Sequence, residues 1–280
     1  PGENLKAGFM GFSQDGASFF VITNERDPRF FDVYRYDSDD YGRELVYRNE
    51  AGYEPAGVSP DGRWLALGQT NTTNDSDLHV AELSTGKLTK VSAHEGQAQF
   101  WAEDFSPDGR WLYYTANDQG EFAVLRRVDL QSWQHEQVRS AEWDIVDAAL
   151  SHDGTYLAVS TNVDGSTKVQ LFETATGAEV GLPDFPAGEV RNLRVSRSED
   201  KLAFYLNGDR QPNDLYVLDL AGGGEPVQLT TSLNPAIDPA DLVDSSVVRF
   251  ASFDGMQIPN ILWKPHQASA DNPAPALVWV

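Results

Sequence analysis

The chain has 280 residues, 40% of them hydrophobic and 11% aromatic, which is enough for a large packed core. Its 43 acidic and 21 basic residues give a formal charge of −22 at pH 7. Such a surface repels phosphate backbones and anionic lipid, so we expect neither nucleic acid nor a membrane as a partner. The absence of cysteine excludes disulfides and thiolate nucleophiles, and it leaves the cellular compartment undecided.

A short phrase recurs along the chain at intervals of 45 to 47 residues. Its copies are "FSQDGASFFVITN" from Phe12, "VSPDGRWLALGQTN" from Val58, "FSPDGRWLYYTAND" from Phe105, "LSHDGTYLAVSTN" from Leu150 and "VSRSEDKLAFYLN" from Val195. Repetition at this period is typical of a solenoid or a propeller, so the local structure of the repeat has to decide between them.

Each copy begins with a predicted turn. Ser-Pro-Asp-Gly suits a type I turn, with a side-chain acceptor first, Pro presetting φ, and Gly where φ becomes positive. Pro is replaced by Gln14, His152 and Arg197, whereas Asp-Gly remains in four copies. The fifth copy loses the Gly and gains one residue, so we expect a looser turn there.

The apolar runs after the turns predict strands, because they are rich in β-branched and aromatic residues and alternate poorly. A second strand follows a polar gap, as in "DVYRY" from Asp32, "DLHVAEL" from Asp77, "VQLFET" from Val169 and "DLYVLDL" from Asp214. A weaker edge strand and the segment before each Ser complete four antiparallel strands per repeat. We therefore predict an all-β fold, a β-propeller of at least five four-stranded blades over residues 1–235.

Every copy of the phrase ends in an asparagine at the same place. Asn tolerates left-handed backbone and caps strand ends, which gives these residues a structural explanation. The second strand of each blade ends at its Asn, so these loops share one face of the propeller with the blade-to-blade connections. The functional alternative is a ring of substrate-facing loops at Asn24, Asn71, Asn117, Asn162 and Asn207.

Charged residues beside this ring are further candidates for substrate contact. Glu25 and Arg26 follow the first ring Asn in "TNERDPRF", and Arg210 lies in "NGDRQPN". An internal salt bridge within the loop is the alternative interpretation of these side chains.

The repeat pattern ends after Thr231. Residues 236–246 form a connector rich in Pro and Asp, and residues 247–265 predict a hairpin around Asp254-Gly255. The final run, "ALVWV", has the composition of a strand buried on both faces of an α/β sheet. Because native chains do not leave such an edge bare, we expect it to begin a second domain of a longer polypeptide.

The blades followed by "SLNPAIDPADLV", "VRFASFDGMQIPNILWKP" and "PALVWV" resemble the prolyl oligopeptidase (S9) family of serine peptidases, in its acylaminoacyl-peptidase and dipeptidyl-peptidase branches. The resemblance covers essentially the whole chain. It implies that residues 247–280 are the first strands of a truncated α/β-hydrolase domain. Family members commonly have seven blades. Either one or two blades precede Pro1, or degenerate blades escape the pattern, or the propeller is unusually small.

The same resemblance implies a parent enzyme that performs Ser-His-Asp acyl transfer to water without a cofactor. The propeller would cap the active site of its own C-terminal hydrolase domain and admit short peptides. No catalytic residue is expected in this chain, which should be inactive alone. Ser151-His152-Asp153 is another copy of the turn, where consecutive residues cannot line up as a triad. The five histidines are scattered without metal-ligand spacing, so no metal site is expected.

Two alternatives remain open at this point. One is a stand-alone, TolB-like propeller that serves as a scaffold for protein–protein contacts. The other is a propeller enzyme with its own central site, such as a glycosidase, which requires carboxylates converging on the inner strands. Glu103, Asp104 and Asp147 are available there, but they do not form a consistent set across the repeats.

Overall fold

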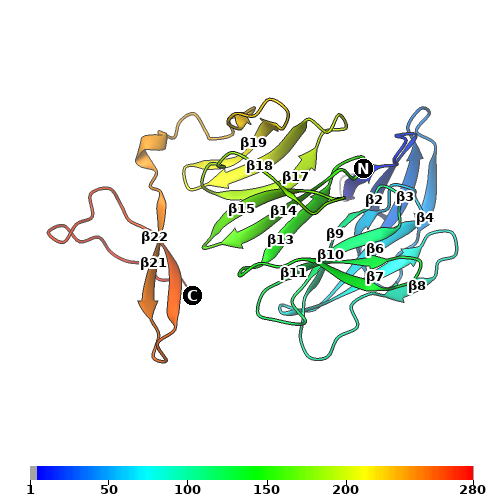
Figure 1. Ribbon diagram of the computed structural model, residues 1–280, viewed down its shortest axis with the longest axis horizontal. Coiled ribbons are helices and arrows are strands. Elements are labelled where there is room, and N and C mark those ends of the chain that lie inside the picture. The colour runs from blue at the N-terminus through cyan, green and yellow to red at the C-terminus, as the bar shows by residue number, and fades with distance from the viewer. Residues whose placement is uncertain (1–4, 280) are drawn as a thin grey trace.

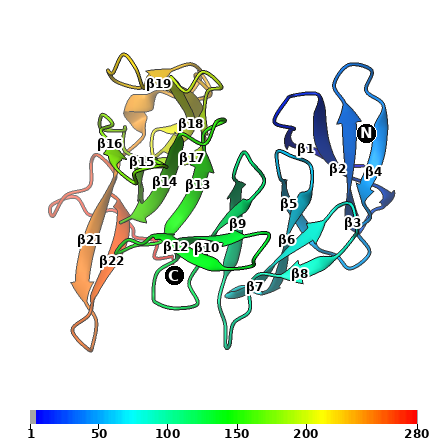
Figure 2. The same ribbon diagram turned by 45° about the vertical axis from the view of Figure 1, so that its right-hand side comes forward.

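The protein, as a computed structural model, is described over residues 5–279 and consists almost entirely of β-strands. Five four-stranded antiparallel sheets follow one another along the chain, and within each sheet the strands pair in chain order. The sheets fan out as the blades of a five-blade β-propeller (Figure 1 and Figure 2). The predicted all-β class and the four strands per repeat are confirmed.

The strand bounds follow the repeat closely. Blade 1 contains β1 (Ala7–Phe12), β2 (Ser18–Asp27), β3 (Phe30–Asp37) and β4 (Arg43–Tyr47); blade 2 contains β5 (Glu54–Val58), β6 (Trp64–Thr72), β7 (Asp75–Glu82) and β8 (Leu88–Lys90); blade 3 contains β9 (Phe100–Phe105), β10 (Trp111–Ala116), β11 (Val124–Asp129) and β12 (His135–Arg139); blade 4 contains β13 (Ile145–Leu150), β14 (Tyr156–Val163), β15 (Ser166–Glu173) and β16 (Glu179–Val180); blade 5 contains β17 (Glu189–Val195), β18 (Lys201–Gly208), β19 (Gln211–Asp219) and β20 (Val227–Gln228).

The five turns share one hydrogen-bond pattern. The Oγ of each repeat Ser accepts the backbone N–H of the residue five positions later, at 2.9 to 3.1 Å. The Gly of the first four copies has positive φ, as predicted. The expectation of a longer, looser fifth turn is wrong: Lys201 stands five residues after Ser196, and Glu199 takes the left-handed position with φ 59°. Asp200 replaces the missing turn Asp by accepting the Ser196 hydroxyl at 2.9 Å.

The hydrophobic core lies between consecutive blades. Buried side chains form four clusters, one at each junction from blade 1 to blade 5. Successive side chains of each second strand point to opposite neighbours, so Leu112 packs toward blade 2 and Tyr113 toward blade 4. This double burial explains why the runs after the turns alternate so poorly in the sequence. The blades therefore stabilise one another as stacked units.

Blade 1 has an apolar face that no other blade covers. Phe12 lies 5.2 Å from Phe9 and 6.0 Å from Phe19 between ring centroids, on the side away from blade 2. Phe9 is 60% exposed and Phe12 56%. Within residues 5–279, no cluster of buried residues joins blade 5 to blade 1. The position of Phe19 is buried against the preceding blade in every other repeat, by Leu65, Leu112, Leu157 and Leu202.

The segment after the blades forms the predicted hairpin. A 3-10 turn, η1 (Pro239–Asp241), precedes β21 (Ser245–Ala251) and β22 (Gln257–Trp263), which pair around Asp254-Gly255 beside the propeller (Figure 1). Residues 276–279 of "ALVWV" form no strand, and Trp279 is 92% exposed; Val280 lies outside the described residues. In the part of the chain that the structure describes, no helix is long and apolar enough to cross a bilayer.

Candidate functional site

Two of the ring asparagines hold the start of the inner strand of their own blade. Asn24 Oδ1 accepts the N–H of Lys6 at 2.7 Å, and Asn117 Oδ1 accepts the N–H of Gln99 at 2.7 Å. The backbone N–H of Asn24 in turn donates to the carbonyl of Lys6, and that of Asn117 donates to the carbonyl of Gln99. Their side-chain oxygens are therefore occupied within the fold, where they fix the entry into β1 and β9.

The side chain of Asn71 is also hydrogen-bonded, and one of its partners belongs to a recurring set of aspartates that was not predicted from the sequence. Its Nδ2 donates to Asp75 at 3.0 Å and to Asp77 at 3.2 Å. Asp77 opens the third-strand run of its blade, as Asp32 and Asp214 do in blades 1 and 5. Each of these carboxylates binds the segment that leaves the fourth strand: Asp77 accepts Ser92 Oγ at 2.7 Å, Asp32 accepts Asn49 N–H at 2.8 Å, and Asp214 accepts Ser232 N–H at 2.7 Å. The recurring Asp at the start of these runs was the available signal.

The charged pair beside Asn24 forms internal ion pairs. Arg26 contacts both carboxylate oxygens of Asp32, at 2.6 and 2.8 Å, and donates to the carbonyl of Asn49 at 2.7 Å. Glu25 pairs with Arg43 at 2.8 Å. The internal salt bridge considered for this loop is therefore present, and these two side chains tie the blade 1 loops together.

A cavity of about 1080 Å³ lies between blades 4 and 5 and the hairpin. Asn162, Asn207 and Arg210 line it, together with Trp263 of β22. Neither Asn162 nor Asn207 makes a side-chain hydrogen bond to any residue from 5 to 279. The ring asparagines thus fall into two groups: those of blades 1 to 3 support the fold, and those of blades 4 and 5 present free amides to this cavity.

A few polar contacts hold the hairpin against the cavity. Asp209 accepts Trp263 Nε1 at 2.7 Å and the N–H of Ser245 at 2.6 Å, and Arg249 pairs with Asp164. Arg210 donates to the carbonyl of Pro239 at 2.8 and 3.0 Å. The loops of blades 4 and 5 therefore set the position of the hairpin, and with it the width of the cavity.

The three inner-strand carboxylates do converge, between blades 3 and 4. Glu103 accepts Thr115 Oγ1 at 2.7 Å and the N–H of Ala148 at 3.3 Å. Asp104 accepts the N–H of Leu150 at 2.9 Å. Burial raises the pKa of Glu103 to about 8, and the nearby Asp147 adds to this shift. Burial raises the pKa of Asp104 to about 6.

Glu103 and Asp104 link blade 3 to blade 4. Glu103 and Asp104 of β9 accept backbone N–H groups of β13 in the neighbouring blade. These hydrogen bonds explain the positions of Glu103 and Asp104 without a bound substrate. Nowhere in residues 5–279 do three His, Asp or Glu side chains lie where they could share a metal ion. The Ser151-His152-Asp153 triplet lies in its turn, with Ser151 Oγ accepting the N–H of Tyr156.

Residues 4–230 match the model of the prolyl oligopeptidase N-terminal beta-propeller domain. The chain belongs to this family. The resemblance seen in the sequence is confirmed, and the match ends where the fifth blade ends.

Solved structures share the fold of this prolyl oligopeptidase-type propeller. A structure from a study of two prolyl endopeptidases has 14% identity and a TM-score of 0.66, and the match covers 94% of this chain and 40% of that one. Prolyl oligopeptidase B from Galerina marginata has 18% identity and a TM-score of 0.64, over 91% of this chain and 38% of that one. TolB from Acinetobacter baumannii has 17% identity and a TM-score of 0.58, over 79% of this chain and 56% of that one.

An uncharacterized protein of Agrobacterium fabrum is 29% identical over 121 residues, which are 42% of this chain and 39% of that protein. The chain therefore spans about two fifths of that relative and of the two peptidase structures. These matches therefore describe the fold of this chain and not the activity of the longer relatives.

Proposed function

We propose that this propeller is the non-catalytic domain of an S9-type serine peptidase, of the acylaminoacyl-peptidase or prolyl oligopeptidase type. It caps the active site of its own C-terminal α/β-hydrolase domain and restricts access to short peptides. Residues 1–235 form the propeller, 236–246 the connector and 247–280 the first strands of the hydrolase. The Ser-His-Asp chemistry belongs to residues outside this chain and needs no cofactor.

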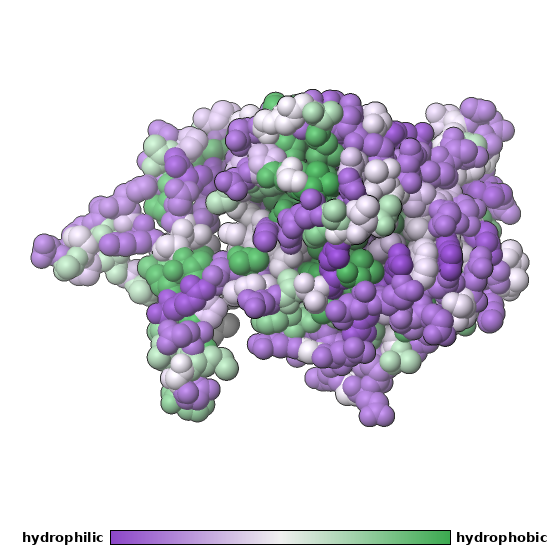
Figure 3. Space-filling model, in the orientation of Figure 1, coloured by the Kyte–Doolittle hydropathy of each residue, from purple (hydrophilic) through white to green (hydrophobic). Residues whose placement is uncertain are grey.

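The main support for this proposal is the hairpin of β21 and β22. β21 and β22 form a two-stranded sheet, and apolar surface is exposed over this hairpin (Figure 3). Phe250 is 56% exposed, Leu262 43%, and Phe253 in the turn between the strands 102%. A two-stranded sheet is marginal by itself, and an exposed apolar surface of this kind is typical of a site for a partner. A hydrolase sheet supplies that cover and also accepts residues 276–280 as a strand.

The extent of the structural similarity supports the peptidase over the scaffold. The likeness to the prolyl endopeptidase covers 94% of the chain and so runs past the propeller into the hairpin, whereas the likeness to TolB covers 79%. The TolB match nevertheless favours a second candidate, a TolB-like scaffold for protein–protein contacts, for the blades alone. The bare face of blade 1 suits one or two further blades, as the seven-blade pattern of the family implies.

The cavity of blades 4 and 5 gives the cap a place for peptide contact. Asn162 and Asn207 offer free donors and acceptors that match a peptide backbone. Asn24, Asn71, Asn117, Glu25 and Arg26 shape the remaining loops of this face, and Arg210 holds the connector. We therefore assign the substrate-facing role to Asn162 and Asn207 only, among the five ring asparagines.

The test compares the complete gene product with this 280-residue chain on acyl-aminoacyl and aminoacyl p-nitroanilides, on peptides of increasing length and on a folded protein. We expect no turnover by the chain alone. The gene product should cleave the short substrates and leave the folded protein intact. Turnover by the chain alone would contradict its non-catalytic role, and equal cleavage of the folded protein would contradict size restriction. A gene product without hydrolase activity would favour the scaffold.

A further inference from the structure

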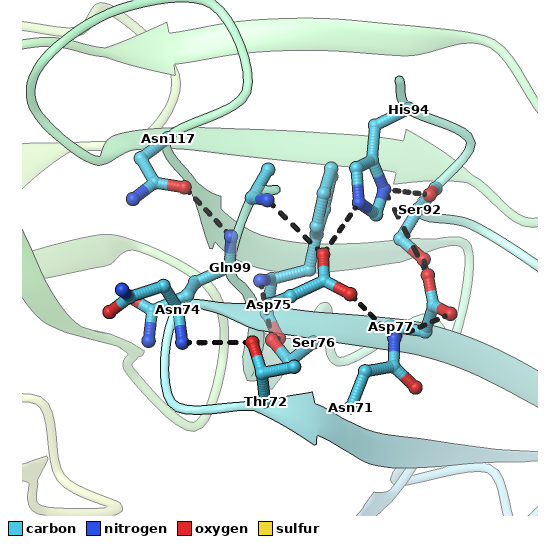
Figure 4. Close-up of polar contacts among 12 residues, drawn as sticks. Asn71, Thr72, Asn74, Asp75, Ser76, Asp77, Ser92, His94, Gln99 and Asn117 are labelled. Carbon is cyan, nitrogen blue, oxygen red and sulfur yellow. Dashed lines mark hydrogen bonds and ion pairs between the residues drawn. The ribbon is translucent and has the colours of Figure 1, made fainter. Parts of the chain in front are cut away.

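The connection from blade 2 to blade 3 contains a histidine whose two ring nitrogens both face acceptors. His94 Nδ1 lies 2.7 Å from the carbonyl oxygen of Ser92, and Nε2 lies 3.0 Å from Oδ1 of Asp75 (Figure 4). A carbonyl and an ionised carboxylate can only accept, so both nitrogens must carry a proton. The geometry therefore requires the imidazolium form of His94.

The charges around His94 are mainly negative. Its side chain is 8% exposed, and Asp77 Oδ1 lies 3.9 Å from Nδ1. Lys90 of β8 opposes this field, but it pairs with Asp77 at 2.8 Å. On the side of β9 the ring meets the uncharged Phe100, with centroids 5.1 Å apart, and Tyr114 of β10 lies beyond it. The hydrogen bond to the Ser92 carbonyl and then the one to Asp75 raise the pKa of His94 above its usual value.

Asp75 joins both ends of the connection. Besides His94, its Oδ1 accepts the N–H of Ala98 at 3.2 Å, and the N–H of Ser76 donates to the carbonyl of Ala98 at 2.9 Å. When the imidazolium loses a proton, one ring nitrogen turns a lone pair toward an acceptor, and the segment loses one of its anchors. The Asp75 carboxylate then also loses the charge that faces it.

We propose that residues 92–98 form a proton-controlled clasp between blades 2 and 3, closed while His94 is charged and loosened when it is neutral. This inference does not depend on the peptidase function. The connection between blades 1 and 2 provides an internal comparison, because Asn49 is held there by Asp32 without a histidine. The clasp lies on the face of the ring asparagines, next to Asn71 and Asn117 (Figure 4).

The direction of the pH effect follows from the raised pKa. The stabilisation by His94 is fully present below the ordinary histidine pKa of 6.5, and it is lost as the pH rises through the higher pKa of the folded state. We therefore expect the clasp to open as the pH rises above the ordinary histidine pKa.

The test is hydrogen exchange of the intact chain at pH 6 and pH 9, corrected for the intrinsic exchange rates. Between the two pH values, protection of residues 92–99 should fall about tenfold more than protection of residues 49–53, which is the effect of one charge-assisted hydrogen bond. NMR titration should give His94 a pKa above 6.5, which Asp75→Asn should lower. In His94→Gln, residues 92–99 should be weakly protected at both pH values. His152→Gln, in the turn of blade 4, should behave like the unchanged protein.

Three outcomes would overturn the clasp. One is a pKa of His94 at or below 6.5. Another is protection of residues 92–99 that does not change with pH, or changes equally in His94→Gln. The third is an equal loss of protection at residues 49–53, which would make the effect global. Circular dichroism of all three variants at pH 6 confirms that each is folded before the comparison is made.

Discussion

Replacing Glu103 with Gln should raise the free energy of unfolding at pH 9 by about 3 to 5 kcal/mol and leave it nearly unchanged at pH 4. Glu103 is neutral in the folded protein up to its pKa of about 8, whereas its ordinary pKa is 4.5. Above pH 8 the native chain must hold a charge on the half-buried Glu103 near Asp104 and Asp147. Gln keeps the shape of the neutral acid and can still accept from Ala148 while donating to Thr115.

The sign of the pH dependence is fixed by the raised pKa. The stability associated with Glu103 is fully present below pH 4.5 and is lost between pH 4.5 and about pH 8. Urea unfolding of both proteins from pH 4 to pH 9 measures the difference at each pH. Glu121→Gln, at an exposed glutamate, is the matched control and should follow the unchanged protein. Parallel curves for Glu103→Gln and the unchanged protein would contradict the burial of this carboxyl group.

Replacing Phe204 with Ala should lower the free energy of unfolding by about 3 to 5 kcal/mol. Phe204 is fully buried between blades 4 and 5, where its ring stacks on Tyr216 at 5.6 Å and contacts Phe185 at 4.8 Å. Removing the ring leaves a cavity in the cluster that joins the two blades. Chemical denaturation at neutral pH measures the loss.

The adjacent residue supplies the control. Tyr205 points to the opposite face of β18 and is 40% exposed, so Tyr205→Ala should change the free energy of unfolding by less than about 1 kcal/mol. Similar losses for both variants would mean that blade 5 buries both faces. A small loss for Phe204→Ala alone would contradict the stacking of blades 4 and 5.

The repeat phrase was sufficient to predict the blades, because the turn and its flanking strands are local structures. Ser-x-Asp-Gly specifies a turn of fixed length, and the apolar runs after it specify strands buried on both faces. The error in the fifth turn has a local cause. Aligning Asp200 with the other turn aspartates suggests an inserted residue, whereas the backbone keeps its length and places Glu199 in the left-handed position.

The candidate site was less predictable, because it depends on contacts between blades. The five asparagines are equivalent in the sequence, yet neighbouring loops occupy Asn24 and Asn117 and leave Asn162 and Asn207 free. Glu103 and Asp104 bind N–H groups 45 and 46 residues away, and only the way two blades stack determines this pairing. The aspartates at the start of the third strands could have been found, since they recur at one position of the repeat.

The central claim, that this propeller caps a serine hydrolase carried on the same polypeptide, can be tested by labelling the complete gene product with a fluorophosphonate probe. The account predicts covalent labelling of one serine that follows Val280 in the sequence, and no labelling within residues 1–280. A gene product that ends near Val280, resists the probe and packs Leu277 and Trp279 against its own blades would contradict it.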